Sequence, residues 1–199
     1  LTGFYMVVGI EGNRDIVDIH ERRAHQLCLE QGAEELPNEH AWQWWNHRYN
    51  FYYPPKCLDF PWMFGTMDTL CTFDKIENLY YTKKKRLEER YAEWELQYIA
   101  HLSHWFPWGA MIYDRFIIEK PPWDPQEALA LHNEIWNVAV RTSIECGAVL
   151  NEHHGVGLKL ARLVREQYGP AFQVLESLKR GLDPANVLNP GKMGFGPTV

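Results

Sequence analysis

The sequence lacks several features that would assign it to a class directly. No apolar run reaches the roughly 18 to 20 residues of a transmembrane helix, so no membrane-spanning segment is expected. The 20 Lys and Arg are outnumbered by 26 Asp and Glu, and the resulting net charge of −6 argues against a nucleic-acid-binding protein. Neither a Gly-x-Gly-x-x-Gly pattern nor a Walker loop occurs, so the chain has no recognisable phosphate-binding loop of its own.

Cysteine is also scarce. Cys28, Cys57, Cys71 and Cys146 form no Cys-x-x-Cys pair and lack the density of a disulfide framework, which indicates reduced thiols in a cytoplasmic protein. A strand pattern begins almost at Leu1, without the basic and apolar regions of a signal peptide. We therefore expect the chain to be the middle of a longer polypeptide or an expressed fragment.

Aromatic residues, in contrast, are abundant. They make up 14% of the chain, with 9 Trp, 10 Tyr and 9 Phe, which predicts a pocket or an interface lined with rings. Five tryptophans lie in segments without a helical or strand period, and we expect them to be partly exposed: Trp44, Trp45, Trp62, Trp105 and Trp108. Because exposed apolar patches favour association, a homo-oligomer is expected.

Hydrophobic periodicity predicts an alternation of strands and helices. Short apolar runs indicate strands at residues 4–10, 66–73, 95–103, 110–118 and 148–150. Helical stripes with capping residues predict helices at about 13–31, 39–46, 74–91, 125–146, 156–168 and 171–182. An irregular aromatic insert is expected at about residues 37–65, and the basic run at 83–86 is expected to lie on a solvated helix face.

The order of these elements indicates an α+β fold. From residue 66 on, strand–helix–strand–strand–helix–strand is the order of the ferredoxin-like split βαβ arrangement. We expect a mostly antiparallel sheet with helices on one face, followed by a C-terminal helical segment. The expected division is a first domain at 1–150 and a C-terminal segment at 151–199.

Histidines form two clusters that could move protons or bind a ligand. His101 and His104 lie in a predicted strand, where their spacing should direct them to opposite faces. His153 and His154 follow a predicted strand and precede Gly155, which would let a ligand approach the backbone closely. From spacing alone, histidines without a chemical role remain an equal alternative.

Two further side chains are candidates with open alternatives. Arg48 lies among aromatic residues, where it either stacks on an indole or forms bidentate hydrogen bonds to a substrate carboxylate or phosphate. Tyr113 lies in the middle of a predicted strand, where it is either a core tyrosine or a functional phenol.

Several motifs together resemble a known family. They are Asn-Glu-His-His-Gly-Val-Gly at 151–157, His-Leu-Ser-His at 101–104 before Tyr113, and Asp-Pro-Ala-Asn-Val-Leu-Asn-Pro-Gly-Lys at 183–192. The aromatic stretch at 44–55 and Phe-Gly-Thr-Met-Asp-Thr at 64–69 fit the same pattern. The chain resembles, over nearly its whole length, the C-terminal part of FAD-linked oxidases of the vanillyl-alcohol oxidase superfamily, in the alkyldihydroxyacetonephosphate synthase-like branch.

The resemblance implies a cofactor, a partner domain and a set of roles. In such enzymes an N-terminal domain holds FAD and a cap domain closes the substrate pocket, so residues 1–150 would be the cap and the FAD-binding domain would be absent from this chain. The implied catalytic residues are Tyr113, His153 and His154; the implied substrate-binding residues are Arg48, His101 and His104; and the implied cofactor-binding residues are Asn189 and Glu152. Metal-using members of the wider family carry a histidine where Trp108 stands and a glutamate where His153 stands, so no catalytic metal is expected.

These expectations converge on a flavin-dependent oxidoreductase. A small anionic hydroxy-substrate would be held through its charge by Arg48, Tyr113 or a histidine would take the hydroxyl proton, and FAD would accept the hydride. Three alternatives stay open: alkyl transfer on the flavin, a non-catalytic ferredoxin-like module that binds a small anion or a partner chain, and a zinc site formed by the four clustered histidines.

Overall fold

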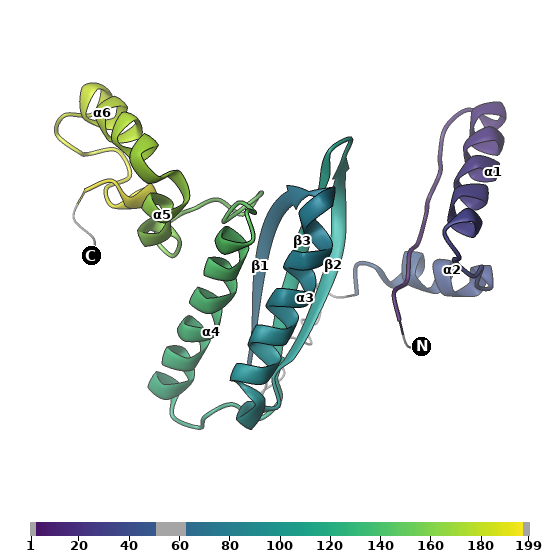
Figure 1. Ribbon diagram of the computed structural model, residues 1–199, viewed down its shortest axis with the longest axis horizontal. Helices are drawn as coiled ribbons and strands as arrows, with labels where there is room; N and C mark the ends of the chain where they lie inside the picture. The colour runs from purple at the N-terminus through teal and green to yellow at the C-terminus, as the bar shows by residue number, and fades with distance from the viewer. Residues whose placement is uncertain (1–2, 51–62, 197–199) are drawn as a thin grey trace. The chain divides into compact units, whose positions relative to one another are not determined.

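The computed structural model describes residues 3–50 and 63–196 and divides into two compact units, residues 1–56 and 57–199 (Figure 1). The first unit contains α1 (Arg14–Glu30) and α2 (Asn38–His47). Asn13 caps α1 by accepting a hydrogen bond from the Asp15 amide at 3.1 Å, as its position before the apolar stripe predicts. Both helices of this unit confirm the sequence-based expectation.

The strand expected at residues 4–10 was wrong. The structure assigns no strand there, and Phe4 is 76% exposed. An apolar run supplies strand propensity, but a strand forms only where a neighbour completes the ladder of hydrogen bonds. All strands in the described residues belong to the second unit.

The second unit is built on a three-stranded antiparallel sheet in the order β1-β3-β2 (Figure 1). Its strands are β1 (Met63–Thr72), β2 (Gln97–Phe106) and β3 (Gly109–Ile118). The helices α3 (Phe73–Arg90) and α4 (Pro125–Glu145) lie side by side over one face, and a 3₁₀ turn, Ala92–Trp94, joins α3 to β2. The expected α+β fold with helices on one face is therefore confirmed.

The segment at 148–150 was expected to form a fourth strand and does not. It still lies beside β1, because the Val149 amide donates to the Leu70 carbonyl at 3.0 Å and Thr69 Oγ1 donates to the Val149 carbonyl. Its place next to β1 reproduces the edge position of the fourth ferredoxin-like strand. The chain leaves this edge at Asn151, so the contact is too short to count as a strand.

Alternation along β3 separates a covered face from an open face. Ile112, Asp114 and Phe116 are fully buried and share the face under α3 and α4, whereas Tyr113 and Arg115 lie on the other face and are half-buried. The open face carries the candidate chemistry.

Lys83 corrects the expected solvated basic face. This lysine of α3 is fully buried, and its Nζ lies 2.6 Å from Asp114 Oδ2, which also accepts a hydrogen bond from the Tyr98 hydroxyl at 2.8 Å. The run of four basic residues hid this position, because consecutive residues of a helix point in different directions and, of the four, only Lys83 is buried against the sheet.

The C-terminal part is less helical than its periodicity indicates. Of the expected helix at 156–168, only α5 (Val164–Tyr168) is α-helical, preceded by the 3₁₀ turn Ala161–Leu163. The turn Gly169–Ala171 leads into α6 (Phe172–Leu182), and a last 3₁₀ turn spans Lys192–Gly194. Residues of this part pack into the same core as the sheet and α4: Leu160, Leu163, Val164 and Phe172. The expected division at residue 150 stays a prediction.

Two surface expectations can be compared with the structure. Trp44, Trp45, Trp105 and Trp108 are 46 to 62% exposed, which confirms the expectation for them, whereas Trp62 lies outside the described residues. Within the described ranges, no helix is long and apolar enough to cross a membrane.

Candidate functional site

The site is built on the open face of the sheet. Asp68 of β1 and His101 of β2 both pair with Tyr113 of β3, so the three residues form one row across the strands. Directly paired residues of antiparallel strands direct their side chains to the same face. Residues 151–157, called the histidine turn below, fold against this row.

Asp68 anchors the histidine turn. Its carboxylate accepts hydrogen bonds from the backbone amides of Glu152 at 2.6 Å and His153 at 2.7 Å, and from Asn151 Nδ2 at 2.8 Å. Asn151 in turn accepts a hydrogen bond from the Gly155 amide at 2.8 Å, which closes the turn. One buried carboxylate therefore fixes the backbone on which the adjacent histidines stand.

The charge of Asp68 is stabilised despite burial. Burial on its own would raise the pKa of this carboxyl group, but the amides of His153 and Glu152 and the nearby imidazoles of His154 and His153 lower it below its ordinary value. The His154 Nδ1 atom lies 2.5 Å from Asp68 Oδ1, and His153 Nδ1 lies 3.4 Å from Asp68 Oδ2. Asp68 is thus an ionised hydrogen-bond acceptor at neutral pH.

The aromatic rings form one continuous cluster. The ring centroids of His153 and His154 are 4.2 Å apart, and Tyr113 lies 6.0 Å from His153 and 5.3 Å from His154. Both imidazoles remain accessible, with side-chain exposures of 37% and 41%. Glu152 supports the cluster, because its Oε2 lies 2.6 Å from His153 Nδ1.

His104 joins this cluster, contrary to the expected opposite orientation of His101 and His104. A bulge interrupts the pairing of β2 with β3 between Ser103 and Phe106, and His104 has a φ of +48° there. The bulge redirects the His104 side chain so that Nδ1 lies 3.2 Å from Glu152 Oε2 and its ring lies 5.3 Å from that of His153. The expectation was wrong because strand alternation holds only while the ladder is regular.

Two predicted site residues have only local contacts among those that the structure describes. Arg48 belongs to the first unit, where its guanidinium stacks 3.7 Å from the Trp45 ring centroid and 4.4 Å from that of Tyr49. Asn189 is exposed in the loop after α6, with a φ of +49°, and its carbonyl accepts the Lys192 amide. Their roles toward substrate and cofactor stay predictions.

Asp68 and Asn151 were missed as site residues, although both stand within the motifs. A signal for Asp68 existed in the sequence, since a carboxylate between Met67 and Thr69 interrupts a strand that is otherwise apolar and hydroxylated. Buried charges require partners, and the partners come from a segment more than 80 residues away.

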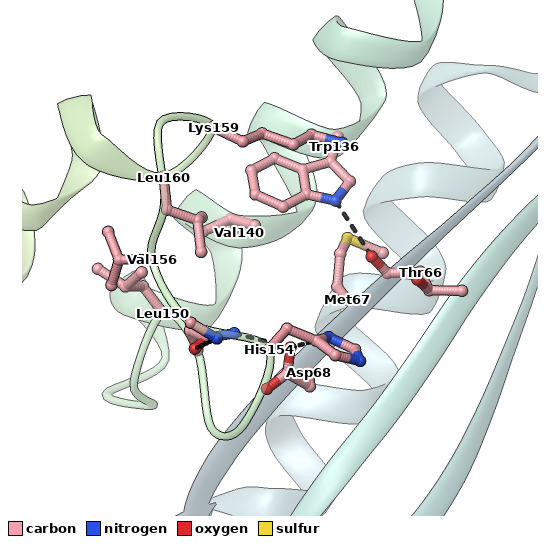
Figure 2. Close-up of a pocket in the computed structure, with 12 residues that line it drawn as sticks. Thr66, Met67, Asp68, Trp136, Val140, Leu150, His154, Val156, Lys159 and Leu160 are labelled. Carbon is pink, nitrogen blue, oxygen red and sulfur yellow. Dashed lines mark hydrogen bonds and ion pairs between the residues drawn. The ribbon is translucent and has the colours of Figure 1, made fainter. Parts of the chain in front are cut away.

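A pocket of about 190 Å³ adjoins the histidine turn and was also missed (Figure 2). His154 and Asp68 lie at one end of it, and Trp136 of α4 lies at the other beside Lys159. Trp136 is held in place by a hydrogen bond from Nε1 to the Thr66 carbonyl at 3.2 Å.

The donor atoms of the cluster form two groups that could also hold a metal ion. One consists of Asp68, His153 and His154, and the other of His104, Glu152 and His153. Hydrogen bonds already occupy the Asp68 oxygens, so the second group has the more available donors. Apart from metal binding, the cluster can transfer protons, because each imidazole has one nitrogen beside a carboxylate and a second nitrogen that can accept or release a proton.

Comparisons with known proteins agree on one family. Residues 1–193 match the family model of FAD linked oxidases, C-terminal domain. The alkyldihydroxyacetonephosphate synthase of Dictyostelium discoideum is 22% identical over 191 residues, or 94% of this chain and 31% of that protein. A probable mitochondrial D-lactate dehydrogenase of Danio rerio is 38% identical over 78 residues, covering 39% of this chain and 16% of that protein.

Solved structures show the same fold. A 4-ethylphenol oxidase from Gulosibacter chungangensis, in an isoeugenol complex, aligns with a TM-score of 0.60 at 17% identity over 94% of this chain and 38% of that one. An alkyldihydroxyacetonephosphate synthase structure aligns with a TM-score of 0.57 at 18% identity over 90% of this chain and 30% of that one. The chain therefore spans about a third of the length of these synthases and this oxidase.

Proposed function

Because this chain belongs to the family of FAD-linked oxidase C-terminal domains, we propose that it forms the substrate side of a flavoenzyme that oxidises a small anionic hydroxy-substrate. The observation that carries the proposal is the ring cluster of Tyr113, His153 and His154, anchored on Asp68 and accessible on the open face of the sheet. Proton-transfer groups on a rigid, helix-backed sheet are what oxidation of a hydroxyl group requires.

The histidine turn supplies the base. Nδ1 of His154 faces Asp68, and Nδ1 of His153 faces Glu152, so Nε2 of each ring is the nitrogen left for a substrate. A carboxylate at Nδ1 stabilises the imidazolium that forms when Nε2 takes a proton. We assign removal of the hydroxyl proton to His154, with the phenol of Tyr113 beside it as the second candidate.

The residues present fit a flavin, since the exposed imidazole rings and the half-buried phenol ring of Tyr113 offer flat surfaces and hydrogen-bond donors on the open face. When bound, FAD would accept the hydride from the substrate carbon. Glu152 and Asn189 are the residues of this chain proposed to contact the cofactor, which would be held mainly by a separate FAD-binding domain. Arg48 is proposed to bind the anionic group of the substrate, with His101 and His104 as further substrate contacts.

The test uses the full protein in which this chain works with a FAD-binding domain. Anaerobic mixing with a series of 2-hydroxy acids should bleach the flavin absorbance, and His154→Ala and Tyr113→Phe should slow that reduction by roughly 10²- to 10⁴-fold, the range of general acid–base catalysis. Tyr168→Phe is the matched control, because Tyr168 is 48% exposed and lies outside the cluster. A full protein that neither contains nor takes up FAD would refute the proposal.

Alkyl transfer without net oxidation is a second candidate, favoured by the match to alkyldihydroxyacetonephosphate synthase over 94% of the chain. The same assay separates the two reactions. Turnover of a 2-hydroxy acid with a dye as electron acceptor supports oxidation, whereas alkyl exchange on a flavin that no hydroxy acid reduces supports transfer.

A further inference from the structure

The pocket beside the histidine turn has an apolar body and two different polar ends. Val140, Leu150 and Val156 line its middle (Figure 2). The carboxylate of Asp68 lies at one end and the ammonium group of Lys159 at the other. The pocket thus combines apolar contact surface with polar side chains at its two ends.

Lys159 has no acidic partner among the residues that the structure describes. Its Nζ lies 4.1 Å from the ring centroid of Trp136, and within the described part of the chain it forms no ion pair or hydrogen bond with a carboxylate. Partial burial, and next the charge of Arg162, lower the pKa of Lys159. Both effects oppose the charged ammonium, and an anion beside Lys159 would relieve them.

The platform under Lys159 is rigid. Trp136 is only 6% exposed, and its indole N–H is bonded to the backbone of β1. An ammonium group held over a fixed aromatic face keeps its position at the pocket end, with its three N–H donors available to a ligand.

The opposite end excludes an anion. Asp68 is ionised, and its oxygens are already occupied by three hydrogen-bond donors. A negatively charged ligand group would meet like charge there, so the anionic end of a ligand is directed to Lys159 and its uncharged part toward His154.

We propose that this pocket is a binding site for a small carboxylate with an apolar body, in which Lys159 holds the carboxylate and Val140, Leu150 and Val156 contact the chain. The inference rests on the proposed function and names the substrate class: the anionic group would be separated from the reacting hydroxyl by an apolar spacer. Lys159 would then be a second contact of that anionic group, besides the proposed Arg48.

Calorimetric titration of the full protein with hexanoate tests the site without any turnover. Saturable binding is expected, and neutral hexanamide should bind at least tenfold more weakly, since a charge-assisted hydrogen bond contributes roughly ten- to hundredfold in affinity. Lys159→Met keeps the apolar stem on Trp136 but removes the charge, and should weaken hexanoate binding by the same factor. Lys120→Met is the matched control, because Lys120 is exposed and lies outside the pocket lining.

Each outcome decides the inference. Absence of saturable binding, equal affinity for hexanoate and hexanamide, or unchanged binding in Lys159→Met would overturn it, as would a loss confined to Arg48→Gln. The proposed function is judged separately by flavin reduction. If hexanoate binding depends on Lys159 but no hydroxy acid reduces the flavin, the carboxylate site is supported and the oxidase proposal is refuted. If a hydroxy acid reduces the flavin with a KM that Lys159→Met does not change, the oxidase proposal is supported and the carboxylate site is refuted.

Discussion

Replacing Asp68 with asparagine should detach the histidine turn from the sheet. Asp68 is 3% exposed and accepts three hydrogen bonds, two of them from the backbone of the turn. Asparagine keeps the shape of the side chain but replaces one hydrogen-bond-accepting oxygen with an N–H₂ group. That group is a donor, and it would face the N–H donors of the histidine turn. The ion pair between the carboxylate and His154 would be lost as well.

The cost can be worked from these contacts. Hydrogen bonds to a charged group contribute about 1.5–3 kcal/mol each, and removing one partner of a buried ion pair costs about 3–5 kcal/mol. Asparagine retains part of the hydrogen bonding, so we expect Asp68→Asn to lower the free energy of unfolding by about 3 kcal/mol at pH 7. Urea denaturation followed by far-UV circular dichroism measures this difference, with the exposed Asp18→Asn as the control.

The deficit should depend on pH with a defined sign. Folding lowers the pKa of Asp68 below 3.8, so its stabilising contribution is complete above that pH and disappears as the pH falls through the lower value of the folded state. The difference between wild type and Asp68→Asn should therefore shrink below about pH 4. Hydrogen exchange should show faster exchange at the Glu152 and His153 amides in the variant. Wild-type stability and unchanged protection of both amides would refute the anchoring role of Asp68.

Three further predictions concern the supporting fold. Asp114→Ala leaves Lys83 buried without its partner and should destabilise the protein by about 3–5 kcal/mol, measured by urea denaturation; a loss below about 1 kcal/mol would contradict the buried pair. Gly109→Ala places a methyl group against the backbone of β1 and should lower the free energy of unfolding by about 1–3 kcal/mol in the same assay. Unchanged stability of this variant would contradict the close approach of the two strands at Gly109. Burial and the hydrogen bond to Glu134 raise the pKa of Tyr91 to about 12, so ultraviolet titration should lose a phenol transition near pH 12 in Tyr91→Phe and keep it in Tyr168→Phe.

The helices and the paired strands could be predicted from the sequence because their signals are local. The Asn13 cap and the apolar stripe of α1, the acidic start of α3 and the alternation of β3 each depend on residues within a few positions of one another. The histidine turn was recognisable for the same reason, since its glycines and adjacent imidazoles are consecutive. The exposure of Trp44, Trp45 and Trp105 was predicted correctly, although the first two lie in α2 and the third lies in β2.

Long-range contacts were inaccessible to this reasoning. The apolar run at residues 4–10 has strand propensity but forms no strand, because pairing is a property of two segments. From the sequence, Lys83 is one of four consecutive basic residues expected at the surface. Only the packing of α3 on the sheet buries it beside Asp114. Similarly, the apolar period at 156–168 was interrupted by 3₁₀ geometry once those residues joined the common core.

The sequence by itself determined the α+β class, the family and the residue types that can move a proton, because each is written in local patterns and motifs. Tertiary structure decided which of these residues act together. A bulge in β2 directs His104 toward Glu152, and a buried carboxylate on β1 holds the turn that carries His153 and His154. Both depend on the pairing of segments far apart in the chain, where geometry and burial, and no local propensity, set the positions of the side chains.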